Sequence, residues 1–186
     1  IAISPAGDIY VSDYRSHVIR KISGGVVSTF AGVPGEPGAT ASPARFNNPR
    51  DLAVDSSGNV FVADTGNYTI RRITPAGSVS TFAGSPGMPG TADGTGIAAR
   101  FQQPEGVATD PSDNVWVAEA YHVIRKVTPA SVVTTFAGTN RGLEDGVGLA
   151  AAFFSPQGIT FGTDGNLYVT ERNGNVIRKI TAAASV

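Results

Sequence analysis

Short apolar runs recur along the chain, and turn residues separate them. One type, represented by Val60-Phe-Val-Ala63, is apolar at every position, where a strand with one solvated face would alternate. It follows a second apolar run of the Leu52-Ala-Val54 type, and the two are joined by a turn that contains Gly58-Asn59. Continuously apolar strands suit a sheet that is covered on both faces, and glycine-asparagine turns are typical of tight hairpins. The pattern predicts short β-strands packed in covered sheets.

Four signatures recur in the same order, so the chain is an internal repeat. The first is Ile9–Asp13, Val60–Asp64, Val115–Glu119 and Leu167–Glu171; the second is Ile19–Ile22, Ile70–Ile73, Ile124–Val127 and Ile177–Ile180. The third is Ser28–Gly32, Ser80–Gly84 and Thr134–Gly138; the fourth is Ala44–Phe46, Ala99–Phe101 and Ala152–Phe154, which shortly precede Pro49, Pro104 and Pro156. Self-similarity at a fixed period indicates a repeat architecture.

Each unit predicts four strands, a to d in chain order. We expect the first strands at Ile1–Ile3, Leu52–Val54, Val107–Thr109 and Ile159–Phe161. A β-propeller covers both faces of every sheet, because each blade lies between two neighbours around an axis. The prediction is therefore an all-β propeller with blades at 1–32, 51–84, 105–138 and 157–186 and linkers at 33–50, 85–104 and 139–156. The fourth blade is expected to lack its outer strand, which should begin where the chain ends, at Val186.

These units resemble the NHL-repeat family. Pro104–Asp110 and Gly58–Asp64 fit its pattern closely and Pro49–Asp55 fits nearly as well, while the linker Phe82–Phe101 resembles a bacterial subgroup. The first linker departs from that subgroup at Thr40-Ala-Ser42. The resemblance implies a six-bladed ring, of which this chain would supply four blades, and an extracytoplasmic location in the periplasm, at the cell surface or in a secreted protein.

Composition and charge narrow the classes of partner. The net charge of −1 gives no general electrostatic reason to bind nucleic acid or an anionic membrane. The chain has no cysteine, which excludes disulfides and thiolate metal sites, and no apolar run is long enough to span a bilayer. The expected partner is a protein or a small-molecule or carbohydrate ligand, with self-association as an option if the chain is one part of a ring.

Length variation places the candidate binding surface. In a propeller the d–a linkers and b–c loops share one face, and here the d–a linkers are long while the opposite turns are short, so we expect any ligand on the long-loop face. The first group of candidate residues follows the prolines and consists of Arg50, Glu105 and Gln157. The second group lies in or beside the b–c loops and consists of Tyr14, Arg15, His17, Tyr68, Tyr121, His122 and Arg172. In the fourth unit, Asn175 occupies the position that His17, Tyr68 and His122 occupy in the other three. The alternatives are a solvated rim for the first group and simple loop closure for the second.

A third group of polar residues is interpreted as structural. A carboxylate ends strand b in every unit, and an arginine follows in strand c, which suggests hydrogen bonds to loop N–H groups or ion pairs more than acid–base chemistry. The carboxylates are Asp13, Asp64, Glu119 and Glu171, and the arginines are Arg20, Arg71, Arg125 and Arg178.

Three functions remain open. A non-catalytic binding or interaction scaffold is the leading hypothesis, with no catalytic residue, metal or cofactor assigned. The alternative is a lyase-like or lactonase-like propeller enzyme with axial Zn²⁺ or Ca²⁺, but the two histidines, His17 and His122, lie on b–c loops and not at the axis. The third is an architectural unit of a surface assembly.

Overall fold

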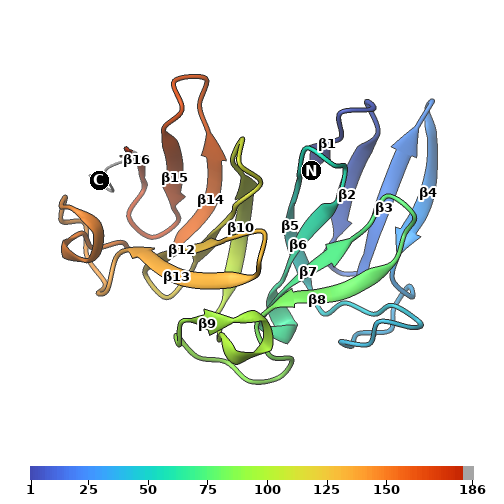
Figure 1. Ribbon diagram of the computed structural model, residues 1–186, viewed down its shortest axis with the longest axis horizontal. Coiled ribbons are helices and arrows are strands. Elements are labelled where there is room, and N and C mark those ends of the chain that lie inside the picture. The colour runs from blue at the N-terminus through green and yellow to red at the C-terminus, as the bar shows by residue number, and fades with distance from the viewer. Residues whose placement is uncertain (182–186) are drawn as a thin grey trace.

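The computed structural model describes residues 1–181 and consists of four antiparallel sheets (Figure 1). Blade 1 is formed by β1 (Ala2–Ile3), β2 (Ile9–Asp13), β3 (Val18–Ser23) and β4 (Val26–Ala31), and blade 2 by β5 (Pro49–Val54), β6 (Val60–Asp64), β7 (Thr69–Ile73) and β8 (Val79–Ala83). Blade 3 is formed by β10 (Pro104–Thr109), β11 (Val115–Glu119), β12 (Val123–Val127) and β13 (Val132–Ala137), and blade 4 by β14 (Pro156–Phe161), β15 (Leu167–Glu171) and β16 (Val176–Ile180). The predicted all-β propeller architecture is confirmed; the fourth outer strand expected at Val186 lies outside the described residues.

The first strand of blades 2 to 4 begins at its proline, three residues before the expected start. Pro49 pairs with Asp64, and a register shift separates this pair from the next one, between Leu52 and Val62. The same irregularity follows Pro104 and Pro156. Proline cannot donate a ladder hydrogen bond, so a proline at the start of a strand conflicts with regular pairing. The bulge resolves this conflict, since it interrupts the ladder beside the residue that follows each proline.

One feature of the linkers, an additional strand, was not expected. Residues 94–95 form a short strand, β9 (Gly94–Thr95), which pairs with β13 and adds a fifth strand to the outer edge of blade 3. The linkers also contain two three-residue 3₁₀ turns, η2 (Gly96–Ala98) and η3 (Gly148–Ala150), and a third, η1 (Thr65–Asn67), lies in the b–c loop of blade 2. From Ile1 to Thr181 none of the helices has the length and apolar character that crossing a membrane requires.

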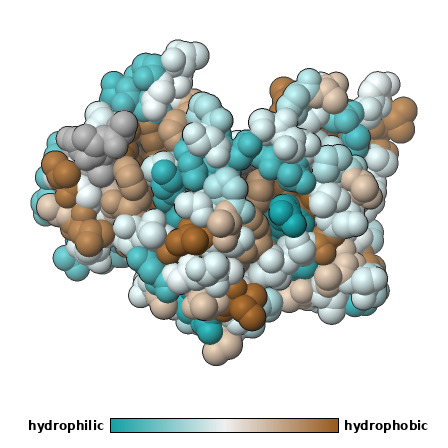
Figure 2. Space-filling model, in the orientation of Figure 1, coloured by the Kyte–Doolittle hydropathy of each residue, from teal (hydrophilic) through white to brown (hydrophobic). Residues whose placement is uncertain are grey.

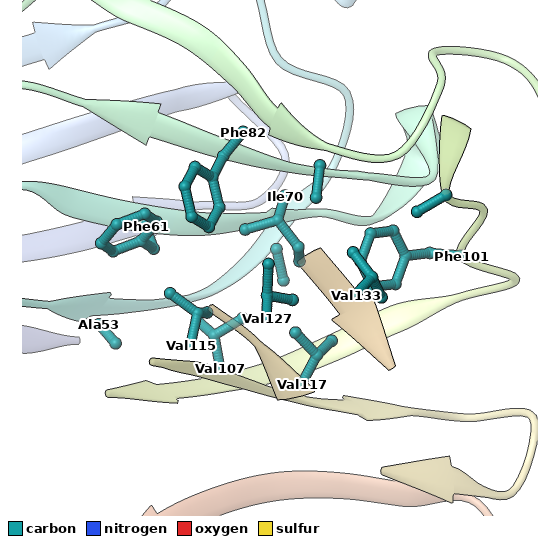
Figure 3. Close-up of a cluster of buried hydrophobic side chains, with 13 residues drawn as sticks. Ala53, Phe61, Ile70, Phe82, Phe101, Val107, Val115, Val117, Val127 and Val133 are labelled. Carbon is teal, nitrogen blue, oxygen red and sulfur yellow. The ribbon is translucent and has the colours of Figure 1, made fainter. Parts of the chain in front are cut away.

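The core lies between successive blades, which explains the continuously apolar strands. In Figure 3, Phe61, Ile70 and Phe82 of blade 2 face Val107 and Val115 of blade 3. Strands β6 and β11, which have a blade on both sides, are buried at every position. Blades 1 and 4 each have one neighbour in the described chain, and their outward residues are exposed, with Val27 at 54% and Ile177 at 71%. Polar side chains predominate on the face drawn in Figure 2, which is notched between the β14–β15 hairpin and the first two blades.

The structure corrects one alignment within the repeat. Phe46, Phe101 and Phe153 are the fully buried linker aromatics, each three residues before its proline. The sequence comparison had aligned Phe154 with Phe46 and Phe101, but Phe154 is only partly buried. The distance to the next proline identifies the true counterpart. Phe153, like Phe46 and Phe101, lies three residues before its proline, whereas Phe154 lies two residues before it.

We expect the two neighbouring phenylalanines to differ sharply in their contribution to stability. Phe153→Ala should lower the free energy of unfolding by about 3–5 kcal/mol, because it leaves a cavity in a sealed core. Phe154→Ala should lower it by about 1 kcal/mol or less, because its ring already contacts solvent. Urea unfolding followed by tryptophan fluorescence measures both; equal losses would contradict the corrected alignment.

Candidate functional site

The strand-b carboxylates of blades 2 to 4 form buried ion pairs with the strand-c arginines of the same blade. The pairs are Asp64–Arg71 at 3.2 Å, Glu119–Arg125 at 2.8 Å and Glu171–Arg178 at 2.9 Å. Burial raises the pKa of Asp64 to about 6 and also raises the pKa of Glu119, in both cases against hydrogen bonds and an arginine that lower it. Charges buried in this way require nearly complete pairing, and the surrounding linker supplies the remaining partners.

Each pair holds the linker that arrives from the previous blade, and we call this arrangement the linker clamp. In blade 3, Glu119 accepts the N–H of Gln102 at 2.6 Å, while Arg125 donates to the carbonyls of Arg100 and Ala92 at 3.1 and 3.2 Å. The guanidinium of Arg125 also lies 5.4 Å from the ring of Phe101. Blades 2 and 4 repeat these contacts with their own linkers. The carboxylates therefore act on the backbone that shapes the loops.

Blade 1 has a different arrangement. Asp13 accepts the loop N–H of Ser16 at 3.3 Å, and Arg20 donates to the hydroxyl of Thr29 on the neighbouring strand. Within residues 1–181 no linker reaches this blade from a preceding unit, so the contacts that complete a clamp in the other three blades are not present here. Of the two roles expected for the carboxylates, Asp13 takes only the loop hydrogen bond.

The structure brings the three residues that follow the prolines into one network. Glu105 of blade 3 is 5% exposed, and its carboxylate accepts from Arg50 of blade 2 at 2.9 Å and from Gln157 of blade 4 at 2.8 Å. Gln103, which precedes the proline of blade 3, donates to the other carboxylate oxygen at 3.1 Å. One buried carboxylate thus joins the inner ends of three blades.

A cavity of about 710 Å³ opens beside this network, and we call it the axial cavity. The ring of Tyr14 lies 5.3 Å from the guanidinium of Arg50 at its edge, and Arg172 contributes from blade 4. Asp51 also lines it and was not among the residues predicted from the sequence. The only signal was that glycines, Gly106 and Gly158, occupy the equivalent positions in blades 3 and 4. The carboxylate of Asp51 accepts the N–H of Val107 at 3.0 Å, and burial raises its pKa.

Two more cavities adjoin the axial cavity on the same face. The one between blades 3 and 4, about 420 Å³, shares Glu105 and Arg172 with it and is lined further by Tyr121, His122 and Arg141. The one between blades 2 and 3, about 330 Å³, includes Tyr14, Arg50, Tyr68 and Tyr121. All three lie among d–a linkers and b–c loops, the elements that the sequence assigned to the candidate face.

The b–c loop residues also determine the backbone conformation of their loops. His17, Tyr68, His122 and Asn175 all have a left-handed backbone, with φ of +59°, +59°, +74° and +52°. The Nδ1 atoms of the two histidines accept N–H groups from the next linker, His17 from Asn48 at 3.0 Å and His122 from Ser155 at 3.3 Å. Left-handed residues are needed to close so short a loop, so loop closure accounts for the recurrence of these positions.

The candidates divide by location. Arg50, Glu105, Gln157, Tyr14, Tyr68, Tyr121, His122 and Arg172 line the three cavities, whereas Arg15 lines a shallow hollow on the open side of blade 1 and His17 lines none of these four. Sequence reasoning missed Arg141 and Phe154, whose guanidinium and ring lie 4.1 Å apart beside His122. Arg141 occurs in the third linker only, and Phe154 was part of the repeat pattern only through its alignment with Phe46 and Phe101, which the structure corrects. Among residues 1–181 no three His, Cys, Asp or Glu side chains cluster as metal ligands.

Comparison with known proteins identifies the repeat. Residues 46–73 match the family described as NHL repeat. NHL repeat-containing protein 2 of Bos taurus is 34% identical over 152 residues, which cover 73% of this chain and 21% of that protein. Among solved structures, an auxiliary nutrient binding protein from Bacteroides thetaiotaomicron superimposes with a TM-score of 0.73 at 21% identity, covering 93% of this chain and 44% of the other. A streptogramin B lyase superimposes with a TM-score of 0.70 at 19% identity, covering 99% and 51%.

The chain therefore spans about half the length of these solved structures and about a fifth of this curated relative. The structural similarities lie below 25% identity and concern the fold alone. The two solved structures carry the names of a binding protein and of an enzyme, so the arrangement of side chains in this chain has to decide between those functions.

The linker clamp predicts a contrast between equivalent carboxylates. Asp64→Asn should lower the free energy of unfolding by about 3 kcal/mol, because within residues 1–181 it leaves the buried charge of Arg71 without a carboxylate partner. Asp13→Asn in blade 1 should cost less than about 1 kcal/mol, because among the described residues 1–181 Asp13 forms no ion pair with an arginine. Chemical denaturation of both variants measures the difference; similar small losses would show that the clamp does not stabilise the fold.

Proposed function

We propose that this chain, which belongs to the NHL-repeat β-propeller family, is a binding module that holds a small ligand on the face formed by its d–a linkers and b–c loops. One observation carries the proposal. Three adjoining cavities on that face share the residues around the Glu105 carboxylate, which donors from blade 2, blade 4 and the linker before blade 3 hold in place. A site assembled from several rigid blades is preorganised, and preorganisation lowers the entropic cost of binding.

The size and lining of the cavities support a small ligand. Cavities of about 420 and 710 Å³ fall within the range of about 300–1,000 Å³ that is usual for small-molecule sites. Aromatic rings, amides and guanidinium groups converge in them, and this mixture supplies flat apolar contact together with directional hydrogen bonds. The extracytoplasmic location and the exclusion of nucleic acid as a partner stay predictions from the sequence.

Blocking variants test this face against the opposite one. Asn173→Trp should fill the cavity between blades 3 and 4, and Gln157→Trp should narrow the axial cavity. Ser112→Trp is the control, because Ser112 lines an apolar hollow at an a–b turn on the other face. Saturation-transfer NMR with a panel of sugars, sugar acids, amino acids and short peptides should give signals that either blocking variant removes and Ser112→Trp keeps.

Two outcomes would contradict the proposal. Signals that persist in both blocking variants and disappear in Ser112→Trp would move the site to the opposite face. No signal from any member of the panel with the unsubstituted protein would remove the support for a small-ligand binding role. Melting temperatures close to that of the unsubstituted protein would show that the tryptophans act locally.

A further inference from the structure

Two arginines line the cavity between blades 3 and 4 without a charge partner. Arg141 lines the cavity from the linker between blades 3 and 4, and Arg172 lines it from the b–c loop of blade 4. Within residues 1–181, neither side chain forms an ion pair or a hydrogen bond. Stacking of Arg141 over the ring of Phe154, at 4.1 Å, restricts its position. Guanidinium groups provide the planar donor pairs that recognise carboxylates. Arg141 is the one that a stacking contact holds, while Arg172 is an exposed side chain on the other side of the cavity.

The acidic side chain of this lining is already neutralised. Glu105 accepts from Arg50, Gln157 and Gln103, so its oxygens are engaged on the floor of the cavity. Desolvation lowers the pKa of His122, and the charge of Arg141 lowers it further, while the charge of Glu171 raises it. The described lining therefore has an excess of positive charge that an anionic group would balance.

The neutral polar groups of the cavity point to a different part of the ligand. Gln103 uses its amide nitrogen on Glu105, and Asn173 uses its amide nitrogen on the hydroxyl of Ser155 at 2.9 Å. Their amide oxygens remain as acceptors, which call for donors on the ligand. Tyr121, 52% exposed at the rim, offers an aromatic surface for a flat face. Hydroxyl groups on a ring satisfy both requirements.

We infer that this cavity binds a sugar acid, with the carboxylate between Arg141 and Arg172 and ring hydroxyls donating to Gln103 and Asn173. The inference rests on the proposed binding function and gives it a ligand class. A volume of about 420 Å³ accommodates a single sugar unit. Because the recognition is partly ionic and the cavity opens to solvent, binding weakens as salt rises.

Calorimetric titration with galacturonate and with galactose tests the assignment. These probes differ at one carbon, which carries a carboxylate in the first and a hydroxymethyl group in the second. The unsubstituted protein should bind galacturonate at least about tenfold more tightly than galactose, since a charge-assisted hydrogen bond contributes more than a neutral one. Arg141→Gln and Arg172→Gln should each weaken galacturonate binding about tenfold and leave galactose binding unchanged.

Arg15→Gln is the matched control, because Arg15 is an exposed arginine outside this cavity. Its affinity for galacturonate should equal that of the unsubstituted protein. Equal affinity for the two probes, or an equal loss in Arg15→Gln, would overturn the sugar-acid assignment while the tryptophan variants still report whether the face binds a small ligand. Failure of galacturonate to bind at all would overturn it as well, and the panel of other probes would then decide the wider proposal separately.

Discussion

The buried pairing of a carboxylate with an arginine is the interaction on which the rest of this chain depends. Propeller blades leave long linkers at one end, and a linker that crosses the surface exposes many backbone groups that require partners. In blades 2 to 4 the pair supplies those partners, because the carboxylate accepts linker N–H groups while the arginine donates to linker carbonyls. A buried aromatic ring beneath each guanidinium completes the arrangement. The linkers are thereby fixed relative to the sheets.

This constraint has a consequence for the ligand face. The residue two positions beyond each clamped aromatic precedes the strand-a proline, and the residue after that proline points into the network around Glu105. Holding the linker therefore also sets where Arg50, Glu105 and Gln157 meet. The clamps repeat while the cavity lining varies from blade to blade, so one scaffold can present different chemistry at each gap. Arg141 and Phe154 are the clearest case, because they belong to one linker alone.

Much of this organisation could be predicted from the sequence, and the limits have physical causes. The continuously apolar β6 and β11 indicated blades covered on both sides, and the register of the repeat predicted that Arg50, Glu105 and Gln157 occupy equivalent positions, where the structure joins them in one network. The start of strand a was misplaced because a bulge tolerates a proline that an ordinary ladder would exclude. Asp51, Arg141 and Phe154 could not be assigned to a site from one sequence, since their importance comes from contacts between blades.

Hydrogen exchange of the linker amides of Asn47, Gln102 and Phe154 reports whether the linker clamps hold the linkers. Each of these N–H groups donates to a buried clamp carboxylate, in contrast to the solvated amides expected of a long surface loop. The account predicts protection comparable to that of the strand amides in the same blade, because exchange would require the clamp to open. Exchange at the rate of an unstructured chain would contradict it, since the linkers would then be held by something other than the carboxylate–arginine pairs.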